Sequence, residues 1–275
     1  MERGVLVPVA EDAKTKSYYK YYEQGIDSPT PEQFAQIDVS KGTAEECLEI
    51  EDRNKVLEPE TTYPEKIGFY PTKDGGLLIA GNIPMPDVDK DMLYWWWAWH
   101  GLEPLRYAIW DPEDHFGVVL NKEGRDRALD ASVPMEEKTW GATHTVQESI
   151  GGPPDEIVIM FQDPKEMGFD VSKVGKEGVD FLICANALLG PMKMPVVMTE
   201  VAKKINGVMT FQARFWVGYH IIDGEPKCLA PVTKLIPESE CDMIAKGLLA
   251  HNVKEFSNLN KVLPKVYAEE KDNWL

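Results

Sequence analysis

Apolar side chains recur at helical spacing near the end of the chain, and they predict one long amphipathic helix over residues 239–263. The apolar stripe consists of Ile244, Leu248, Leu259 and Val262. Ser239, three residues before Asp242, has the pattern of an N-cap. Pro264 is the expected end of the helix, because proline has no backbone N–H.

Alternating patterns before this helix predict strands, and the clearest pair is a hairpin around Asn206-Gly207. The predicted pairs are Met209 with Lys204, Phe211 with Ala202, Ala213 with Glu200, Phe215 with Met198 and Val217 with Val196. This face is mostly apolar and should point inward, with Tyr219 continuing it. Glu200 and Lys204 are polar exceptions. Either they point inward, or they form a rim salt bridge, or the register is shifted by one residue.

Further elements follow from turn residues and caps. The predicted strands are residues 68–72, 76–86, 140–152 and 156–164, while residues 180–188 fit a strand or a helix. The predicted helices are residues 29–36, capped by Thr30, residues 43–57, capped by Thr43, and residues 89–102. An antiparallel sheet crossed by a long C-terminal helix is an α+β layout with a pocket between the two layers. We expect one domain, residues 66–275, with an N-terminal helical extension over residues 1–65.

Composition narrows the classes of function. The net charge of −17 argues against a nucleic acid or an anionic membrane as partner, since both need basic patches. The densest apolar run, residues 92–99, is too short to span a bilayer, and the first residues lack a signal-peptide pattern. The four cysteines form no C-x-x-C pair, which favours free thiols in the cytoplasm.

His251 and Glu255 interrupt the apolar stripe of the long helix. They are four residues apart, so their side chains lie one turn apart on the same face. A buried histidine and a buried carboxylate both need a partner. A divalent metal would supply one, because His-x-x-x-Glu offers two ligands from consecutive turns, and a His–Glu hydrogen bond is the alternative. The pair alone leaves both interpretations open.

The other histidines differ in context. Alternation along residues 143–148 puts His144 and Glu148 on one face of a strand. His115 is expected in an acidic loop, where a surface role and a ligand role are equally supported. His100 and His220 are expected to be structural.

Four runs of sequence occur together in a recognisable order. They are WWWAWHGLEPLRYAIWDPEDHFG at 95–117, a strand with Glu148, FQARFWVG at 211–218 and HNVKEFSNLNKVLPKVYAEE at 251–270. Together they resemble the 2,4-diacetylphloroglucinol hydrolase and phloretin hydrolase family. The resemblance covers about residues 60–275, which is nearly all of the predicted domain.

This resemblance implies a zinc enzyme with a helix-grip fold, similar to the Bet v 1 and START proteins. It implies hydrolysis of the C–C bond between a phloroglucinol ring and an acyl group. By motif, the family's metal ligands fall on His115, Glu148, His251 and Glu255. They imply one Zn²⁺ per chain, with iron or manganese open because half of the ligands are carboxylates.

The resemblance also bears on the substrate. The family's ring-contacting tyrosine falls on Tyr107. A family asparagine shortly after the first histidine ligand has no counterpart, since Val118 stands at that place. That difference favours phloretin over 2,4-diacetylphloroglucinol.

The expected substrate is therefore a small aromatic ketone, and a homo-oligomer stays open. Tyr107 and Tyr219 are candidates for holding the ring hydroxyls. The candidate catalytic residues are Tyr107, His144 and Glu200. Of these, His144 and Glu200 are the candidates for proton transfer. A helix-grip protein that binds an apolar ligand without chemistry is one alternative, and metal-dependent aldol or decarboxylation chemistry is another.

Overall fold

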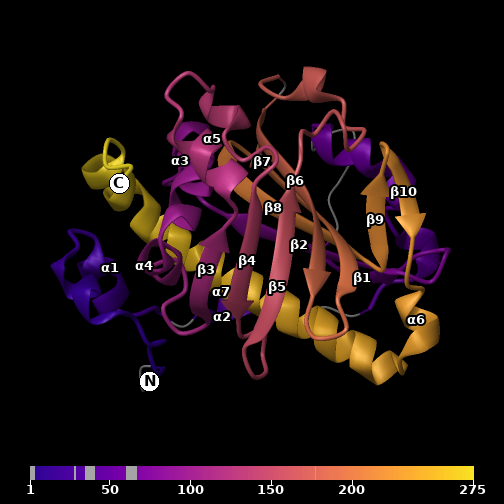
Figure 1. Cartoon of the computed structure of the whole chain (residues 1–275). Coiled ribbons are helices and arrows are strands. Elements are labelled where there is room, and N and C mark those ends of the chain that lie inside the picture. The colour runs from indigo at the N-terminus through magenta and orange to yellow at the C-terminus, as the bar shows by residue number, and fades with distance from the viewer. Residues whose placement is uncertain (1–3, 28, 35–40, 60–66, 177) are drawn as a thin grey trace.

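The computed structural model describes residues 4–27, 29–34, 41–59, 67–176 and 178–275. Its centre is an eight-stranded antiparallel sheet with the order β1-β2-β8-β7-β6-β5-β4-β3 (Figure 1). The strands are β1 Gly68–Pro71, β2 Leu77–Pro84, β3 His115–Leu120, β4 Thr143–Glu148, β5 Asp155–Phe161, β6 Val179–Leu189, β7 Met194–Ile205 and β8 Val208–Val217. A small hairpin, β9 Tyr219–Ile222 and β10 Glu225–Cys228, follows the sheet. The ambiguous segment 180–188 is therefore a strand.

Most helices are short. The α-helices are α1 Tyr19–Glu23, α2 Pro31–Phe34, α3 Lys90–Trp99, α4 Pro104–Ala108, α5 Lys122–Leu129, α6 Val232–Leu235 and α7 Glu238–Glu270. The 3₁₀-helices are η1 Glu11–Thr15, η2 Ala44–Glu46, η3 Ile50–Leu57, η4 His100–Leu102, η5 Met135–Glu137 and η6 Val171–Lys173. The predicted helix at 89–102 is thus α3 followed by η4, and the Asp89 side chain caps it by accepting from the Met92 N–H.

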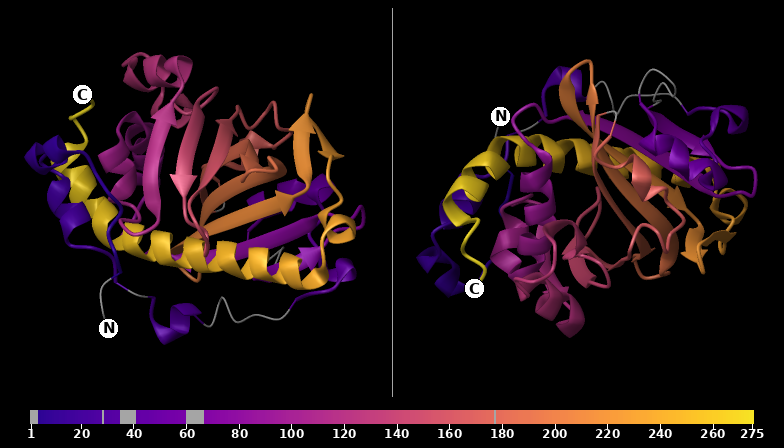
Figure 2. Two further views of the ribbon diagram at one scale, coloured as in Figure 1. Left: turned by 60° about the horizontal axis from the view of Figure 1, so that its bottom comes forward. Right: turned by 90° about the horizontal axis from the view of Figure 1, so that it is seen from above.

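The long helix α7 lies across the sheet and spans its width (Figure 2). One continuous core joins the inner face of the sheet, α3 and the buried side of α7. This arrangement confirms the predicted α+β fold, a large antiparallel sheet with a long C-terminal helix. The site described below lies between these two layers.

The ends of α7 differ from the prediction. The helix begins at Glu238 after Pro237, with no side-chain cap, and it continues through Pro264 to Glu270. An internal proline costs about 3 kcal/mol. Leu263 and Val266 are fully buried beside it, and each such side chain contributes about 1.5–3 kcal/mol. Burial therefore outweighs the lost hydrogen bond.

The hairpin register at Asn206-Gly207 is confirmed, since all five predicted pairs join β7 and β8. Glu200 is buried on the inner face, so neither a rim salt bridge nor a shifted register applies to it. Lys204 is exposed near the end of the strand, and its Nζ lies 3.9 Å from Asp180 Oδ2.

Tyr219 does not continue the inner face, and this prediction is wrong. Gly218 has a φ of +99° and lies between β8 and β9, so it breaks the alternation of the strand. Tyr219 packs in the cluster on the outer face instead, and its hydroxyl lies 2.7 Å from Thr72 Oγ1.

The outer face of the sheet is covered by part of the N-terminal segment. Residues 43–57 form two 3₁₀-helices rather than one α-helix, although Thr43 makes the predicted cap as a capping box with Glu46. Trp216 Nε1 on the outer face donates to Leu48 O at 2.9 Å. In the helix predicted at 29–36, the Thr30 hydroxyl accepts from Gln33 N at 3.3 Å, and residues 35 and 36 lie outside the described part.

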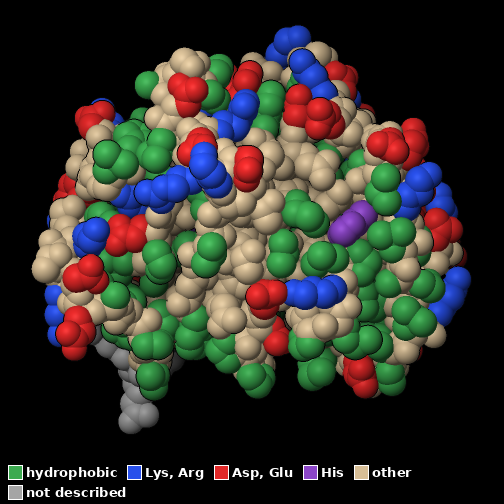
Figure 3. Space-filling model, in the orientation of Figure 1, with side chains coloured by type: hydrophobic (Ala, Val, Ile, Leu, Met, Phe, Trp, Pro, Cys, Tyr) green, Lys and Arg blue, Asp and Glu red, His purple; other side chains and the backbone are tan. Residues whose placement is uncertain are grey.

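Figure 3 shows acidic and basic side chains interspersed over one face of the molecule, with hydrophobic side chains along its lower edge. Within the described residues, no helix combines the length and apolar character needed to cross a membrane. The division of the chain at residue 65 stays a prediction, because residues 60–66 lie outside the described part.

Candidate metal centre and active site

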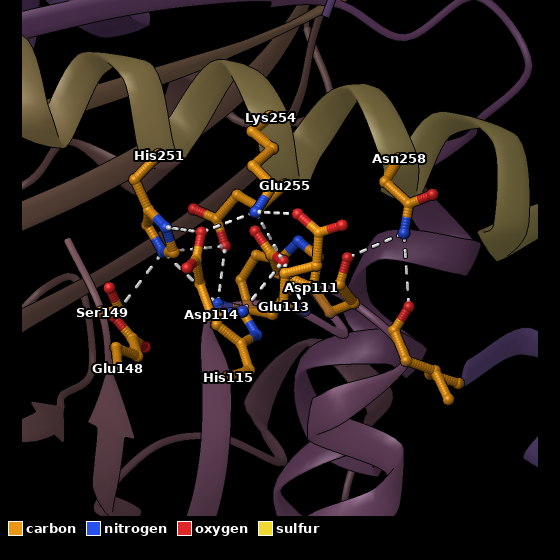
Figure 4. Close-up of polar contacts among 12 residues, drawn as sticks. Asp111, Glu113, Asp114, His115, Glu148, Ser149, His251, Lys254, Glu255 and Asn258 are labelled. Carbon is orange, nitrogen blue, oxygen red and sulfur yellow. Dashed lines mark hydrogen bonds and ion pairs between the residues drawn. The ribbon is translucent and has the colours of Figure 1, made fainter. Parts of the chain in front are cut away.

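Four nitrogen and oxygen donors converge between α7 and the β3–β4 edge of the sheet (Figure 4). His115 Nε2 lies 3.4 Å from His251 Nε2 and 3.4 Å from Glu255 Oε2. His251 Nε2 lies 3.7 Å from Glu148 Oε2 and 3.9 Å from Glu255 Oε2. A tetrahedral zinc site with bonds of about 2.0–2.1 Å needs donors about 3.3–3.4 Å apart. His115, His251 and Glu255 therefore fit a single metal ion with small adjustments, and Glu148, whose carboxylate lies near His251, would have to move closer to join them.

Three elements supply these donors. His115 opens β3 and pairs with Glu148 at the end of β4, so the two side chains leave neighbouring strands together. His251 and Glu255 follow each other by one turn of α7. The prediction that His115 belongs to a loop is wrong, since the loop ends one residue earlier and the β3–β4 ladder begins at His115.

Tyr107 fixes the orientation of the His115 ring. It lies in α4, in the stretch expected to be a loop. Its ring stacks on His115 with centroids 4.2 Å apart, and its carbonyl lies 3.2 Å from His115 Nδ1. A hydrogen bond from Nδ1 leaves Nε2 as the free donor toward the metal position.

An acidic loop and a lysine support His251. Asp114 Oδ2 lies 3.9 Å from His251 Nδ1. Lys254 Nζ lies 2.7 Å from Asp114, 3.0 Å from Glu113 and 3.2 Å from Asp111. Asp111, Asp114 and His251 are close enough to hold a second ion, but the Lys254 ammonium already forms ion pairs with both carboxylates. We therefore assign these acids to the support of His251.

Two asparagines on α7 complete the support. Asn252 Nδ2 donates to Glu255 Oε1 at 2.8 Å, which leaves Oε2 toward the metal position. Asn258 Nδ2 donates to Trp110 O at 2.8 Å and so ties α7 to the loop before His115. The roles of Lys254 and Asn252 were not predicted from the sequence. Their positions next to the His-x-x-x-Glu pair were the available signal.

Burial shifts the pKa values of the candidate ligand residues. It raises the pKa of Glu148 and raises that of Glu255 well above its usual range. Burial and the neighbouring His251 lower the pKa of His115 well below its usual range. Burial also acts to lower the pKa of His251, but attraction to Glu255 and other acids raises it to about 10. A divalent cation would stabilise the carboxylates that burial disfavours.

The same cavity holds the other predicted polar residues. Tyr107, His144 and Glu200 line it together with the ligand residues His251 and Glu255. Tyr107 Oη and Glu200 Oε2 are buried without a hydrogen-bond partner among the described residues. Burial, with a smaller effect from Glu148, raises the pKa of Glu200 well above its usual range, which favours the protonated carboxyl.

His144 lies at the end of the cavity beside His100. Their ring centroids are 5.2 Å apart, and burial lowers the pKa of both, that of His100 to about 4. Gly101 makes room for His144, because a Cβ at residue 101 would lie 2.6 Å from His144 Cε1. His100 is buried and its Nδ1 lies 2.7 Å from Trp96 O, in line with the predicted packing role. Tyr219 lies outside this cavity, on the opposite face of the sheet.

Comparison with known proteins matches residues 48–268 to the DAPG hydrolase PhiG domain. The chain belongs to this family. It is 38% identical to a phloretin hydrolase of Eubacterium ramulus over 98% of this chain and 96% of the relative. It is 27% identical to a 2,4-diacetylphloroglucinol hydrolase of a Pseudomonas species, over 93% of this chain and 89% of the relative.

Both relatives of this family member are named hydrolases, and both match along nearly their whole length. Among solved structures, Ara h 8.0201 matches 64% of this chain and 96% of its own, with a TM-score of 0.30 and 7% identity. That likeness is too weak to support a functional argument.

Proposed function

We propose that this protein is a zinc-dependent hydrolase that cleaves the aryl–acyl C–C bond of acylphloroglucinols. The proposed substrate is phloretin, and the products are phloroglucinol and 3-(4-hydroxyphenyl)propionate. The observation that carries the proposal is the convergence of His115, Glu148, His251 and Glu255 at a cavity with unpartnered polar groups. The 38% identity to a protein named phloretin hydrolase supports the choice of substrate.

The reaction adds one water to the ketone. The oxygen of water bonds to the carbonyl carbon, the bond to the ring carbon breaks, and its electron pair stays with the ring. A proton must then reach that ring carbon, which yields a carboxylic acid and the free phenol. A bound Zn²⁺ would supply Lewis-acid polarisation of the carbonyl and water with a pKa near 7.

The chain's own residues would hold the ring and move the proton. Tyr107 Oη is buried without a partner, so it is free to bond a ring oxygen. Glu200 faces the same cavity, and burial raises its pKa and so favours its protonated form, which makes it the first candidate to donate to the ring carbon. His144 is the second candidate. Its neutral ring can accept a proton from a ring hydroxyl.

The donor set favours an enzyme over a carrier of apolar ligands. A carrier gains nothing from burying four ionisable groups at one point, because each costs desolvation energy. Two histidines and two carboxylates suit Zn²⁺. Iron and manganese also accept such ligands, so the experiment below compares all three metals. We place the reaction in the cytoplasm, in keeping with four free cysteines.

The test combines metal analysis with product analysis. Purified protein should contain about one zinc per chain, and a chelator should abolish cleavage of phloretin until zinc, and not iron or manganese, is returned. His251→Asn should lose zinc and turnover. His220→Asn is the matched control, because His220 lies outside the cavity and bonds Ala187 O.

Chromatography of the products decides among the alternatives. Phloroglucinol plus the aryl acid supports hydrolysis, whereas other products indicate aldol or decarboxylation chemistry. Active protein without a transition metal would overturn the zinc proposal. Turnover of 2,4-diacetylphloroglucinol with none of phloretin would reverse the choice of substrate.

A further inference from the structure

A second cavity adjoins the one at the metal centre and continues it toward the surface. It encloses about 350 Å³ between the β4–β5 turn, the β6–β7 turn and the first half of α7. The two cavities share five lining residues, which are Glu148, Ile150, Ile157, Leu189 and Leu248. We call them the inner and the outer cavity. Glu148 is thus both a metal-ligand candidate and part of the boundary between them.

Helix α7 runs beside both cavities and shows their order. Glu255 and His251 line the inner cavity, Leu248 lines both, and Ile244 and Cys241 line the outer one. At about 1.5 Å per residue, Leu248 lies about 4.5 Å and Ile244 about 10 Å from His251 along the helix axis. The outer cavity therefore begins within one turn of the metal centre.

The inner cavity is small and polar at its closed end. It encloses about 70 Å³, whereas a single water needs roughly 10–15 Å³ on this measure, so the space suits about one substituted ring. Tyr107, His144 and Glu200 supply polar atoms for the hydroxyls of such a ring. The outer cavity is mainly apolar, and its lining includes Met194, Ile236 and Ile244.

We infer that the outer cavity binds the acyl substituent of the ketone, so that this enzyme takes acylphloroglucinols with long or aryl-bearing acyl chains. The inference rests on the proposed function. The scissile carbonyl must lie at the metal centre, the polyhydroxy ring fills the inner cavity, and the shared boundary gives the acyl chain a path into the outer cavity. Met194 and Ile236 then limit its length and width.

Filling the outer cavity should change selectivity between two ketones. Met194→Trp and Ile236→Trp each add bulk there, and kcat/KM is measured for phloretin, with an arylpropanoyl group, and for 2,4-diacetylphloroglucinol, with acetyl groups. The ratio of the two values should fall at least tenfold in both variants. Met243→Trp is the matched control, because Met243 lies on α7 outside both cavities and is 67% exposed. Its ratio should equal that of the wild type.

Metal content and thermal midpoint are measured on each variant, so that a folding defect is separated from a loss of selectivity. If Met194→Trp misfolds, the ratio measured for Ile236→Trp alone decides the test. An unchanged ratio in folded, metal-loaded variants overturns the inference and leaves the proposed function intact. Failure of the wild type to cleave either ketone overturns the proposed function, and the inference with it.

Discussion

Glu200 and Lys203 lie three residues apart on β7, both buried, on opposite faces of the sheet. Lys203 Nζ on the outer face donates to Glu58 O at 2.9 Å and to Val56 O at 3.1 Å. Glu200 Oε2 on the inner face has no hydrogen-bond partner among the described residues. One strand thus carries a satisfied buried charge on one side and an unsatisfied carboxyl on the other.

The same contrast extends to other charged groups. On the outer side, the Arg53 guanidinium donates to Met167 O, Ile50 O and Gly224 O. The buried Gln212 amide is an uncharged exception, since neither of its polar atoms has a partner among the described residues. On the inner side, the carboxyls and Tyr107 Oη gather at one cavity. The buried charges of Lys203 and Arg53 on the outer face are thus satisfied within the fold, whereas Glu200 Oε2 and Tyr107 Oη on the inner face are not, which is what groups that bind a ligand would show.

The largest expected effect is the loss of the metal from Glu255→Ala. The variant removes one donor and leaves the buried His251 and His115 facing a space. We expect zinc content to fall from about one per chain to near zero and turnover to fall at least a thousandfold. Glu269→Ala, an exposed glutamate on the same helix, is the control. Full zinc content in Glu255→Ala would exclude Glu255 as a ligand.

Next in size is Tyr107→Phe. It removes one buried hydroxyl and keeps the ring that stacks on His115, so the fold and the zinc content should persist. A donor to developing charge contributes about 2.7–4 kcal/mol. We therefore expect kcat to fall about a hundredfold or more, with a smaller change in KM. Loss of zinc, or full activity, would contradict the role given to Tyr107.

A smaller effect should follow from Lys254→Met. Lys254 holds three acids of the loop that supports His251, and loss of such outer contacts typically costs about 10–100-fold in metal affinity. Competition with a chelator of known zinc affinity measures this directly. Lys254→Arg keeps the charge and should restore most of the affinity. Equal affinity in the methionine variant would show that the loop is held by other contacts.

The smallest expected effects are those of separate substitutions on the outer face and the inner face of β7. Lys203→Met should lower the free energy of unfolding by about 1–3 kcal/mol, because two carbonyls lose a charged donor. Glu200→Leu removes an unpaired buried carboxyl, so stability should equal or exceed that of the wild type while turnover falls at least tenfold. Denaturant unfolding and turnover are measured on both variants. If Glu200→Leu is less stable than the wild type, the carboxyl of Glu200 stabilises the fold, and the proposed difference between the two faces of β7 is wrong.

The sequence predicted those parts of the fold that local rules determine. The two-residue turn at Asn206-Gly207 fixed the register of β7 and β8, and helical spacing placed His251 beside Glu255. Local rules failed where tertiary contacts decide. Burial carried α7 through Pro264, and a single glycine with positive φ sent Tyr219 to the other face.

Within the candidate site, helical spacing placed His251 and Glu255 together, whereas His115 and Glu148 were assigned to the same site by the family resemblance and not by spacing. His115 and His251 are 136 residues apart in sequence, and no local pattern predicts that they meet. The contacts of Lys254 with the acidic loop depend on how α7 crosses the sheet edge. Such contacts can be predicted only once the packing of α7 against the sheet is known.

The close approach of Gly101 to His144 links two positions that are far apart along the chain. A Cβ at residue 101 would lie 2.6 and 2.7 Å from two atoms of the imidazole. In evolutionary terms, residue 101 is not free to drift alone. A lineage that gains a side chain at residue 101 must move or replace the imidazole at residue 144, which changes one end of the cavity. Residues 101 and 144 should therefore change together among the relatives of this chain.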